Sequence, residues 1–250
     1  MNGMLYLIGL GLNDEEDLSL KAINVMKKCS EVYCELYTGI WHGDIKKLEK
    51  MVEKKMVILE RREVEDNSLL EKAKKRNVAL LIPGDPLTAT THIEFLIEAK
   101  KMKIDVEIIH SSSIFTAVAE TGLQLYKFGR TASLPWSEKN YKPESFYDII
   151  EENYKQGLHT LILLDTAKEG MNVKNALKIL IEIENKRKKN IISKERIVVC
   201  SALGSKKKII KYGNVKVIQK INFNKPSVII IPGKLNFKEE EALQLWGIQK

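Results

Sequence analysis

The sequence lacks the features that would assign it to a membrane or to the secretory pathway. No run of about 18 or more apolar residues is present, so no segment predicts a transmembrane helix. The first residues, MNGMLYLIGLG, lack the basic lead, apolar stretch and small-residue cleavage site of a secretory leader. We therefore expect a cytoplasmic protein that does not engage a membrane.

Cysteine is scarce. The three cysteines, Cys29, Cys34 and Cys200, cannot all pair, and their spacing matches no Cys-x-x-Cys or Cys/His metal pattern. We interpret them as buried or incidental thiols in a reducing compartment and expect no metal site.

Arginine is scarce as well, at six of the 41 basic residues, whereas phosphate and base recognition favours the bidentate arginine fork. The formal net charge of +8 is a weak indication of an acidic partner or of nucleic acid. The lysines stand in pairs and triplets such as Lys206–Lys208, which is more typical of a solvated face. We therefore expect no direct contact with nucleic acid.

The first half of the chain alternates short apolar runs with segments of helical period. At 250 residues and 44% hydrophobic, the chain is long enough for one large α/β domain or two of ordinary size. Strands are predicted at residues 4–9, 32–37, 56–60, 78–82 and 106–110. Helices are predicted at residues 19–29, 44–54, 68–75 and 91–101. This order predicts a mostly parallel sheet, in which ligands bind beyond the carboxyl ends of the strands.

The second half is less regular and predicts a mixed sheet. Strands are predicted at residues 131–134, 160–164, 197–201, 208–212, 215–218 and 227–231, and the close pairs among them favour antiparallel neighbours. Helices are predicted at residues 145–155, 172–186 and 238–245. We therefore predict two α/β domains, 1–112 and 113–250.

GLGLND follows the first predicted strand. Its Gly9 and Gly11 would let the backbone approach a ligand closely. Asp14 stands where the dinucleotide fingerprint has its third glycine, which disfavours a nicotinamide or flavin site. A tight strand-to-helix turn remains an equally good interpretation.

LIPGDPLTATTH, residues 81–92, is more specific. Pro83 and Pro86 hold Asp85 and several backbone amides rigidly at the end of a strand, and Thr90 or Thr91 would cap the next helix. Such a site suits a zwitterionic ligand whose carboxylate meets backbone N–H groups. Alternatively, Asp85 only holds the turn. His92, in the first helical turn, is interpreted as packing or surface rather than as a general base.

SSSI, residues 111–114, follows the fifth strand, and its hydroxyls either cap the next helix or line a pocket. His110 and His159 adjoin strands without a metal partner nearby in sequence. We interpret both histidines as structural.

Together, these motifs resemble the diphthine synthases, a family of the tetrapyrrole methylase superfamily. The resemblance rests on MLYLIGLGL, CELYT, PGDPLTATTH, HSSSI, TGLQLYKFGR, GLHTLILLD and IIIPGKL, which span nearly the whole chain in order. It implies S-adenosylmethionine as methyl donor, bound in a cleft between two α/β domains of a homodimer. The implied acceptor is the amino group of an aminocarboxypropyl histidine on translation elongation factor 2, and the compact chain looks like the archaeal form, whose product is diphthine.

The resemblance also implies a set of donor contacts. Carried over position by position, they are Leu12, Asp85, Thr88, Ser113, Ile114, Leu164, Leu203 and Ser227. Ser227 and Asn236 stand where relatives commonly have histidine, and the segment 39–50 is shortened. Asp85 is expected to orient the donor, and no general base is assigned.

Two other functions remain open at this point. The nearest is a methyltransferase of the same superfamily that acts on a tetrapyrrole or on ribosomal RNA. The other is a non-catalytic or ribosome-associated protein that retains the donor pocket. The assignment of the substrate rests wholly on the resemblance, because the periodicity of the sequence predicts only the α/β fold class.

Overall fold

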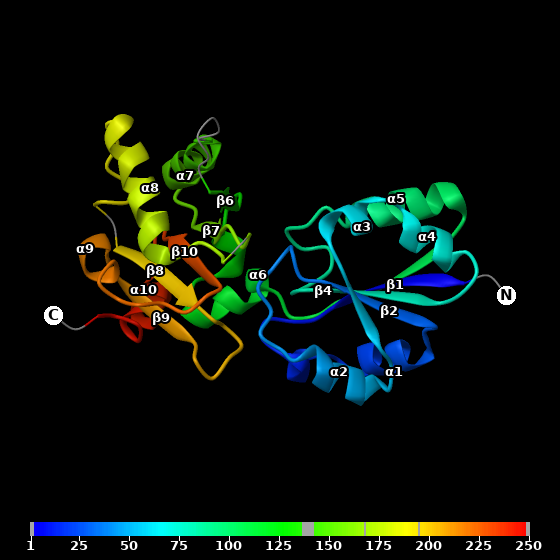
Figure 1. Ribbon diagram of the computed structural model, residues 1–250. Coiled ribbons are helices and arrows are strands. Elements are labelled where there is room, and N and C mark those ends of the chain that lie inside the picture. Colours follow the sequence, from blue (N-terminus) through cyan, green and yellow to red (C-terminus); the bar gives the residue numbers. More distant parts are fainter. Residues whose placement is uncertain (1–2, 137–142, 168, 195, 249–250) are drawn as a thin grey trace. The chain divides into compact units, whose positions relative to one another are not determined.

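The protein forms two compact units, Met1–Phe115 (unit 1) and Thr116–Lys250 (unit 2). The computed structural model in Figure 1 describes residues 3–136, 143–167, 169–194 and 196–248. Each unit is built on a five-stranded sheet, parallel in unit 1 and mixed in unit 2. The predicted fold class, with a parallel and a mixed α/β half, is confirmed.

Unit 1 has the strand order β3-β2-β4-β1-β5. These strands are β1 (Met4–Gly9), β2 (Glu31–Glu35), β3 (Met56–Leu59), β4 (Val78–Ile82) and β5 (Asp105–Ile109). The central strand β4 has the sequence VALLI and is buried along its whole length, as expected for a parallel strand covered on both faces. All the strands run in one direction, so their carboxyl ends share one edge of the sheet.

Helices cover both faces of this sheet (Figure 1). One face carries α1 (Leu20–Lys28) and α2 (Ile45–Val52), and the other carries α3 (Arg61–Glu65), α4 (Ser68–Ala73) and α5 (Ile93–Met102). Alternation along each strand produces two separate cores, because successive side chains point to opposite faces.

The first two helices begin where polar side chains cap them. Ser19 accepts a hydrogen bond from the Ala22 amide at 3.1 Å, and Asp44 accepts one from the Lys46 amide at 2.8 Å. Each cap satisfies a backbone donor that the first helical turn leaves without a partner, which is why these helices start one residue inside their predicted ranges.

Unit 2 has the strand order β6-β7-β10-β8-β9. These strands are β6 (Ala132–Leu134), β7 (Thr160–Leu164), β8 (Arg196–Ser201), β9 (Ile209–Asn214) and β10 (Ser227–Ile231). Only β6 and β7 pair in parallel; β10 runs antiparallel to both of its neighbours, and β8 and β9 are antiparallel as predicted.

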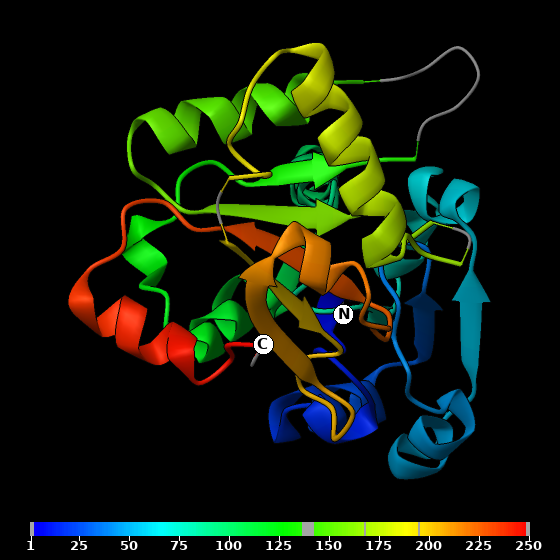
Figure 2. The same cartoon turned by 90° about the vertical axis from the view of Figure 1, so that its left-hand side faces the viewer.

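The helices of unit 2 lie on both sides of its sheet. The core on one face is formed with α7 (Ser145–Lys155) and α8 (Val173–Lys186). Figure 2 shows α10 (Phe237–Gln244) on the other side of the sheet. The short helix α6 (Ile114–Ala117) contains the division between the units.

One predicted strand is wrong. Residues 215–218, VKVI, form helix α9 (Val215–Ile218), and the Asn214 side chain accepts a hydrogen bond from the Val217 amide at 3.0 Å. This cap turns the chain out of the ladder directly after β9, so the β-branched residues pack as one helical turn. Among the described residues, no helix is long and apolar enough to cross a membrane.

Candidate active site

Three loops of unit 1 meet at the carboxyl edge of its parallel sheet. They follow β1, β4 and β5, which are neighbours in the sheet. The backbones of Gly11 and Gly84 exchange two hydrogen bonds, of 3.2 and 2.9 Å. The sequence motifs GLGLND and PGDPLTATTH are therefore joined directly, although 68 residues lie between them in the sequence.

Gly9 explains why the loops lie so close. A Cβ at Gly9 would come within 2.4 Å of the Gly84 carbonyl oxygen and 2.6 Å of the Ser111 Cβ. Only a residue without a side chain leaves room for this approach. Gly84 differs, because its φ of +68° favours glycine while a Cβ there would meet nothing within 4 Å among the described residues.

The Asp85 carboxylate lies inside this junction and is buried. Oδ1 accepts hydrogen bonds from the Leu87 amide and the Thr88 hydroxyl, both at 3.1 Å. Oδ2 accepts from His110 Nδ1 at 2.7 Å and from the Ser111 amide at 3.3 Å. The bonds from Leu87 and Thr88 hold the turn that follows Asp85.

The hydrogen bonds to Asp85 also set its charge. Burial alone would raise the pKa of this carboxyl, but the bonds from His110, the Leu87 amide, Thr88 and the Ser111 amide outweigh it, so the pKa is lowered. Asp85 is therefore ionised at neutral pH.

His110 was interpreted from the sequence as structural, and the structure gives it a different setting. It directly follows β5, and its side chain is 70% exposed although Nδ1 contacts buried Asp85. Sequence reasoning missed this pair because its members lie 25 residues apart. The available signal was that two parallel strands, β4 and β5, are each followed by polar residues, and these lie at one edge of the sheet.

The start of α5 differs from the sequence expectation. His92 occupies the N-cap position without a side-chain cap, so neither Thr90 nor Thr91 caps the helix. Instead, the Thr90 hydroxyl accepts from the His92 amide at 3.0 Å and contacts His92 Nδ1 at 2.9 Å. His92 is buried, in agreement with its interpretation as a packing residue, and burial lowers its pKa to about 4.

Glu35, from the motif CELYT, is buried close to His92. Its carboxylate accepts hydrogen bonds from the Tyr37 and Thr38 amides and from the Thr38 hydroxyl, which fixes the loop after β2. Oε1 lies 3.8 Å from His92 Nε2, and this nitrogen has no hydrogen-bond partner among the described residues. Burial raises the pKa of Glu35.

Ser113 and Ile114 lie where the third loop enters α6. Ser113 is buried, and its hydroxyl accepts from the Phe115 amide at 3.3 Å, which is the predicted capping interaction. Leu12, in the first loop, is partly buried. Loop packing therefore brings Leu12, Asp85, Thr88, Ser113 and Ile114 to one edge of unit 1.

The remaining candidates lie at one edge of the sheet of unit 2. Because β10 is antiparallel to β7 and β8, its first residue, Ser227, lies beside their carboxyl ends and pairs with Ser201. Leu164 ends β7, and Leu203 follows β8. The Ser227 hydroxyl donates to the Asn224 carbonyl at 2.6 Å, so this side chain already has a structural partner.

His159 and Asn236 are structural. His159 is fully buried; its Nδ1 accepts from the Gly233 amide at 2.8 Å, and its Nε2 lies 2.9 Å from Glu239 Oε1. The Asn236 side chain caps α10 by accepting from the Lys238 and Glu239 amides, both at 3.0 Å. Asn236, which stands where relatives commonly have histidine, therefore serves in this chain as a helix cap.

The cysteines are free and buried, as interpreted from their spacing. Burial raises the pKa of Cys29 to about 11 and those of Cys34 and Cys200 to about 12, so all three are poor nucleophiles at neutral pH. Within the described ranges, no cluster of three or more His, Cys, Asp or Glu residues could hold a metal ion.

The comparisons with known proteins agree with this architecture. A family model described as Tetrapyrrole (Corrin/Porphyrin) Methylases matches residues 4–218. The chain belongs to this family.

Two relatives and one solved structure to which the chain is similar are named diphthine synthase. This tetrapyrrole methylase is 45% identical to a diphthine synthase of Methanocaldococcus jannaschii, over 96% of this chain and 98% of that protein. It is 44% identical to a diphthine synthase of Methanococcus maripaludis, with the same coverage of 96% and 98%. A solved diphthine synthase structure matches with a TM-score of 0.90 and 34% identity, over 98% of this chain and 96% of that one. The resemblance inferred from the motifs is confirmed.

Proposed function

We propose that this chain is a diphthine synthase. It transfers methyl groups from S-adenosylmethionine to the amino nitrogen of the aminocarboxypropyl histidine of translation elongation factor 2 and so forms diphthine. The observation that carries the proposal is similarity along nearly the full length of both chains, at 45% identity, to a protein of that name. The three joined loops of unit 1 support it, because they place a rigid, glycine-lined backbone surface at the ligand-binding edge of a parallel sheet.

The residues of the first edge fit the donor. Gly84 presents bare backbone with open space where a side chain would stand, and this suits close approach of a zwitterion. We propose donor contacts from Leu12, Thr88, Ser113 and Ile114. Asp85 would contribute through its backbone, because both carboxylate oxygens already accept hydrogen bonds from the protein.

At the edge of unit 2, we propose contacts from Leu164, Leu203 and Ser227. The two leucines are buried aliphatic residues that would pack against the apolar parts of the donor. Ser227 would contact the donor through its backbone, because its hydroxyl is committed to Asn224.

S-adenosylmethionine supplies a methyl group on an already activated sulfonium carbon. The protein must then hold the acceptor amine in line, with its lone pair about 3 Å from that carbon. A fixed loop junction achieves this positioning better than mobile side chains would. The Gly9 and Gly84 contacts provide such a junction.

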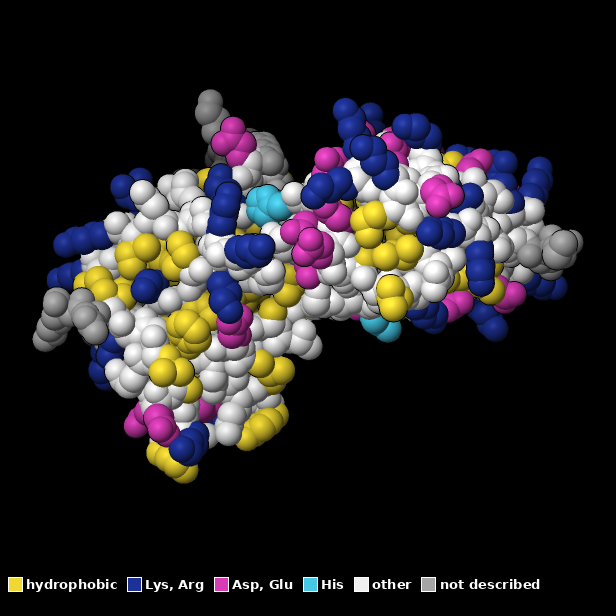
Figure 3. Space-filling model, turned by 90° about the horizontal axis from the view of Figure 1, so that it is seen from below, with side chains coloured by type: hydrophobic (Ala, Val, Ile, Leu, Met, Phe, Trp, Pro, Cys, Tyr) yellow, Lys and Arg dark blue, Asp and Glu magenta, His cyan; other side chains and the backbone are white. Residues whose placement is uncertain are grey.

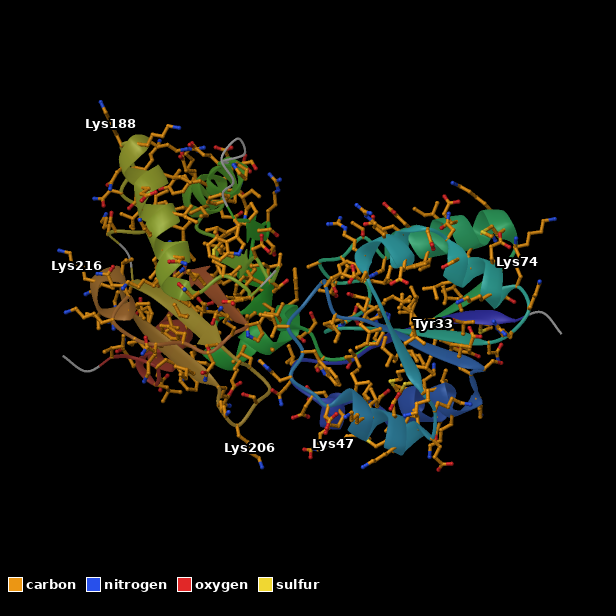
Figure 4. The ribbon with its side chains drawn as sticks, in the orientation of Figure 1. Tyr33, Lys47, Lys74, Lys188, Lys206 and Lys216 are labelled. Carbon is orange, nitrogen blue, oxygen red and sulfur yellow. The ribbon has the colours of Figure 1, made fainter. Side chains whose placement is uncertain are left out.

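The protein substrate is proposed to meet a positively charged enzyme. Lys188, Lys206 and Lys216 are exposed and extend outward from three different segments of unit 2 (Figure 4). On the face drawn in Figure 3, basic side chains are interspersed with acidic and apolar ones rather than gathered into one field. This distribution suits weak steering of an acidic protein surface more than a nucleic-acid groove.

We also propose that the protein is a homodimer located in the cytoplasm.

Mass spectrometry of elongation factor 2 tests the proposal. The factor, bearing the unmethylated aminocarboxypropyl histidine, is incubated with this protein and S-adenosylmethionine. A gain of three methyl masses on that residue is the expected result. If calorimetry shows donor binding but the mass of the factor does not change, the assigned substrate is wrong. Methyl transfer to ribosomal RNA or to a tetrapyrrole would then identify a different activity of the same family.

A further inference from the structure

His110 combines an exposed ring with a buried anchor. Its side chain is 70% exposed, while Nδ1 lies 2.7 Å from the buried carboxylate of Asp85. Among the described residues, Asp85 is the one carboxylate with an oxygen within 4 Å of a ring nitrogen of His110. Three further hydrogen bonds hold this carboxylate in place, so its position beside the ring is fixed.

The contact with Asp85 determines which ring nitrogen carries the proton. An ionised carboxylate accepts hydrogen bonds and cannot donate them, so Nδ1 of the neutral ring carries the hydrogen. The lone pair of the neutral imidazole is then on Nε2, at the other side of the ring. This is the arrangement by which a carboxylate orients a histidine base.

The location of His110 fits this chemistry. It stands directly before Ser111, whose Cβ is one of the atoms that a side chain at Gly9 would strike. The ring therefore belongs to the loop junction at which the donor contacts of unit 1 gather. Two charged groups on the neighbouring loops lie close to residues 110–113, namely Asp85 after β4 and Asp17, which lies beside Gly11 and Ser112. The loop after β1 also carries Asp14, Glu15 and Glu16.

We propose that His110 Nε2 is the general base that removes a proton from the acceptor ammonium before each methyl transfer, and that Asp85 positions the ring. The inference rests on the proposed function, because it requires an amine acceptor. At neutral pH an alkylamine is mostly protonated, and the resulting ammonium has no lone pair with which to attack. A base near the acceptor would remove the proton and restore that lone pair.

Each step balances. The N–H bond of the acceptor ammonium breaks, its electron pair stays on nitrogen, and the proton moves to His110 Nε2 and then to water. The nitrogen lone pair forms a bond to the methyl carbon while the carbon–sulfur bond breaks, leaving its pair on sulfur as a neutral thioether. The methylated nitrogen is again cationic and loses its next proton in the same way. The trimethylated nitrogen has no proton left, so the sequence stops.

The variant His110→Asn separates a base from a structural residue. The asparagine amide nitrogen takes the place of Nδ1 and can still donate to Asp85, but no basic nitrogen replaces Nε2. We expect donor affinity to stay within about twofold and kcat at neutral pH to fall about 10²- to 10⁴-fold. The deficit should shrink as the pH rises, because a growing fraction of the acceptor is already the free amine.

Two further variants complete the test. His110→Ala should regain part of its turnover with added imidazole, which a purely structural role would not permit. Asp85→Asn should bind the donor and lose turnover, because its amide would accept from His110 less well and would no longer fix the tautomer. Donor binding is measured by calorimetry for each variant, so a collapsed site is recognised by the loss of donor affinity.

The outcomes distinguish this inference from the proposed function. Wild-type methylation of the factor, with His110→Asn turning over within about threefold of wild type, would overturn the base and leave the function intact. A large deficit that neither pH nor imidazole changes would also overturn it. Failure of the wild-type protein to methylate the factor would instead overturn the proposed function.

Discussion

The His110–Asp85 pair of unit 1 and the His159–Glu239 pair of unit 2 are of similar length, at 2.7 and 2.9 Å, in contrasting surroundings. His110 is largely exposed and keeps Nε2 away from its carboxylate. His159 and Glu239 are both 0% exposed, and both ring nitrogens of His159 have protein partners. The same two kinds of side chain thus serve chemistry in one unit and stability in the other, depending on whether a ring nitrogen remains available.

In the His159–Glu239 pair, every contact of the carboxylate is to a group of the protein itself. Its carboxylate accepts from Lys127, His159 and the amides of Gln124 and Asn236. Burial would raise its pKa, but these hydrogen bonds outweigh burial and lower the pKa to about 2. The charge of Glu239 therefore joins α10 to the segment before β6.

Removing Glu239 should have the largest effect. We expect Glu239→Ala to lower the free energy of unfolding by about 3–5 kcal/mol, because Lys127 loses its anion and several buried donors lose their acceptor. Urea denaturation measures this. Glu152→Ala is the matched control, since its pair with Arg130 is half exposed and should contribute less than about 1 kcal/mol. Equal losses in the two variants would contradict the buried-pair account.

His92 extends the comparison to a third histidine. Burial lowers its pKa from 6.5 to about 4, so between these pH values the unfolded chain binds more protons than the folded one. Its contribution to stability is full above pH 6.5 and is lost as the pH falls towards 4, by about 3 kcal/mol in total. Subtracting the pH profile of His92→Gln from that of wild type should reveal this slope. If the stability of the two proteins changes with pH in the same way, His92 is not held in its neutral form by burial.

The glycines of unit 1 test whether the loop junction is a close-packed structure. Gly9→Ala should destabilise by about 1–3 kcal/mol and weaken donor binding, because the new methyl group pushes the three loops apart. Gly84→Ala meets open space and should lose only about 1 kcal/mol, through its left-handed backbone conformation. Thermal unfolding and calorimetry compare them, and the reverse order of effects would refute the proposed crowding.

Ser227 should give the smallest effect. Removing its hydroxyl loses one hydrogen bond to the Asn224 carbonyl, which also accepts from Ser201, so no buried acceptor is abandoned. We expect Ser227→Ala to lower stability by less than about 1 kcal/mol and to change donor affinity less than about twofold. A tenfold loss of donor affinity, measured by calorimetry, would mean that the hydroxyl itself contacts the donor.

Much of the fold could be predicted from the sequence where apolar runs were bounded by glycine or proline. Residues 78–82 and 227–231 were predicted with the bounds observed for β4 and β10, because each run is buried on both faces and is followed directly by a proline. Helix α3 was missed, since its five residues, RREVE, include only one apolar side chain and form a single turn stabilised by a Glu60–Glu63 capping box.

The site was predictable only in part. PGDPLTATTH identified Asp85, because two prolines around a glycine and an aspartate mark a shaped loop. The role of His110 could not be read from the same pattern, because the pairing depends on β5 lying two strands from β4 with β1 between them. Sequence spacing therefore predicts where the loops are, whereas their contacts with one another depend on the strand order.

The central claim is that His110 of unit 1 serves methyl transfer while His159 of unit 2 serves stability. The decisive measurement is kcat and the free energy of unfolding for His110→Asn and His159→Asn side by side. We predict that His110→Asn lowers kcat at least about 100-fold and changes stability by less than about 0.5 kcal/mol. His159→Asn should lower stability by about 2 kcal/mol or more and leave the turnover of folded protein near wild type. The opposite pattern, or equal loss of both quantities in both variants, would contradict the account.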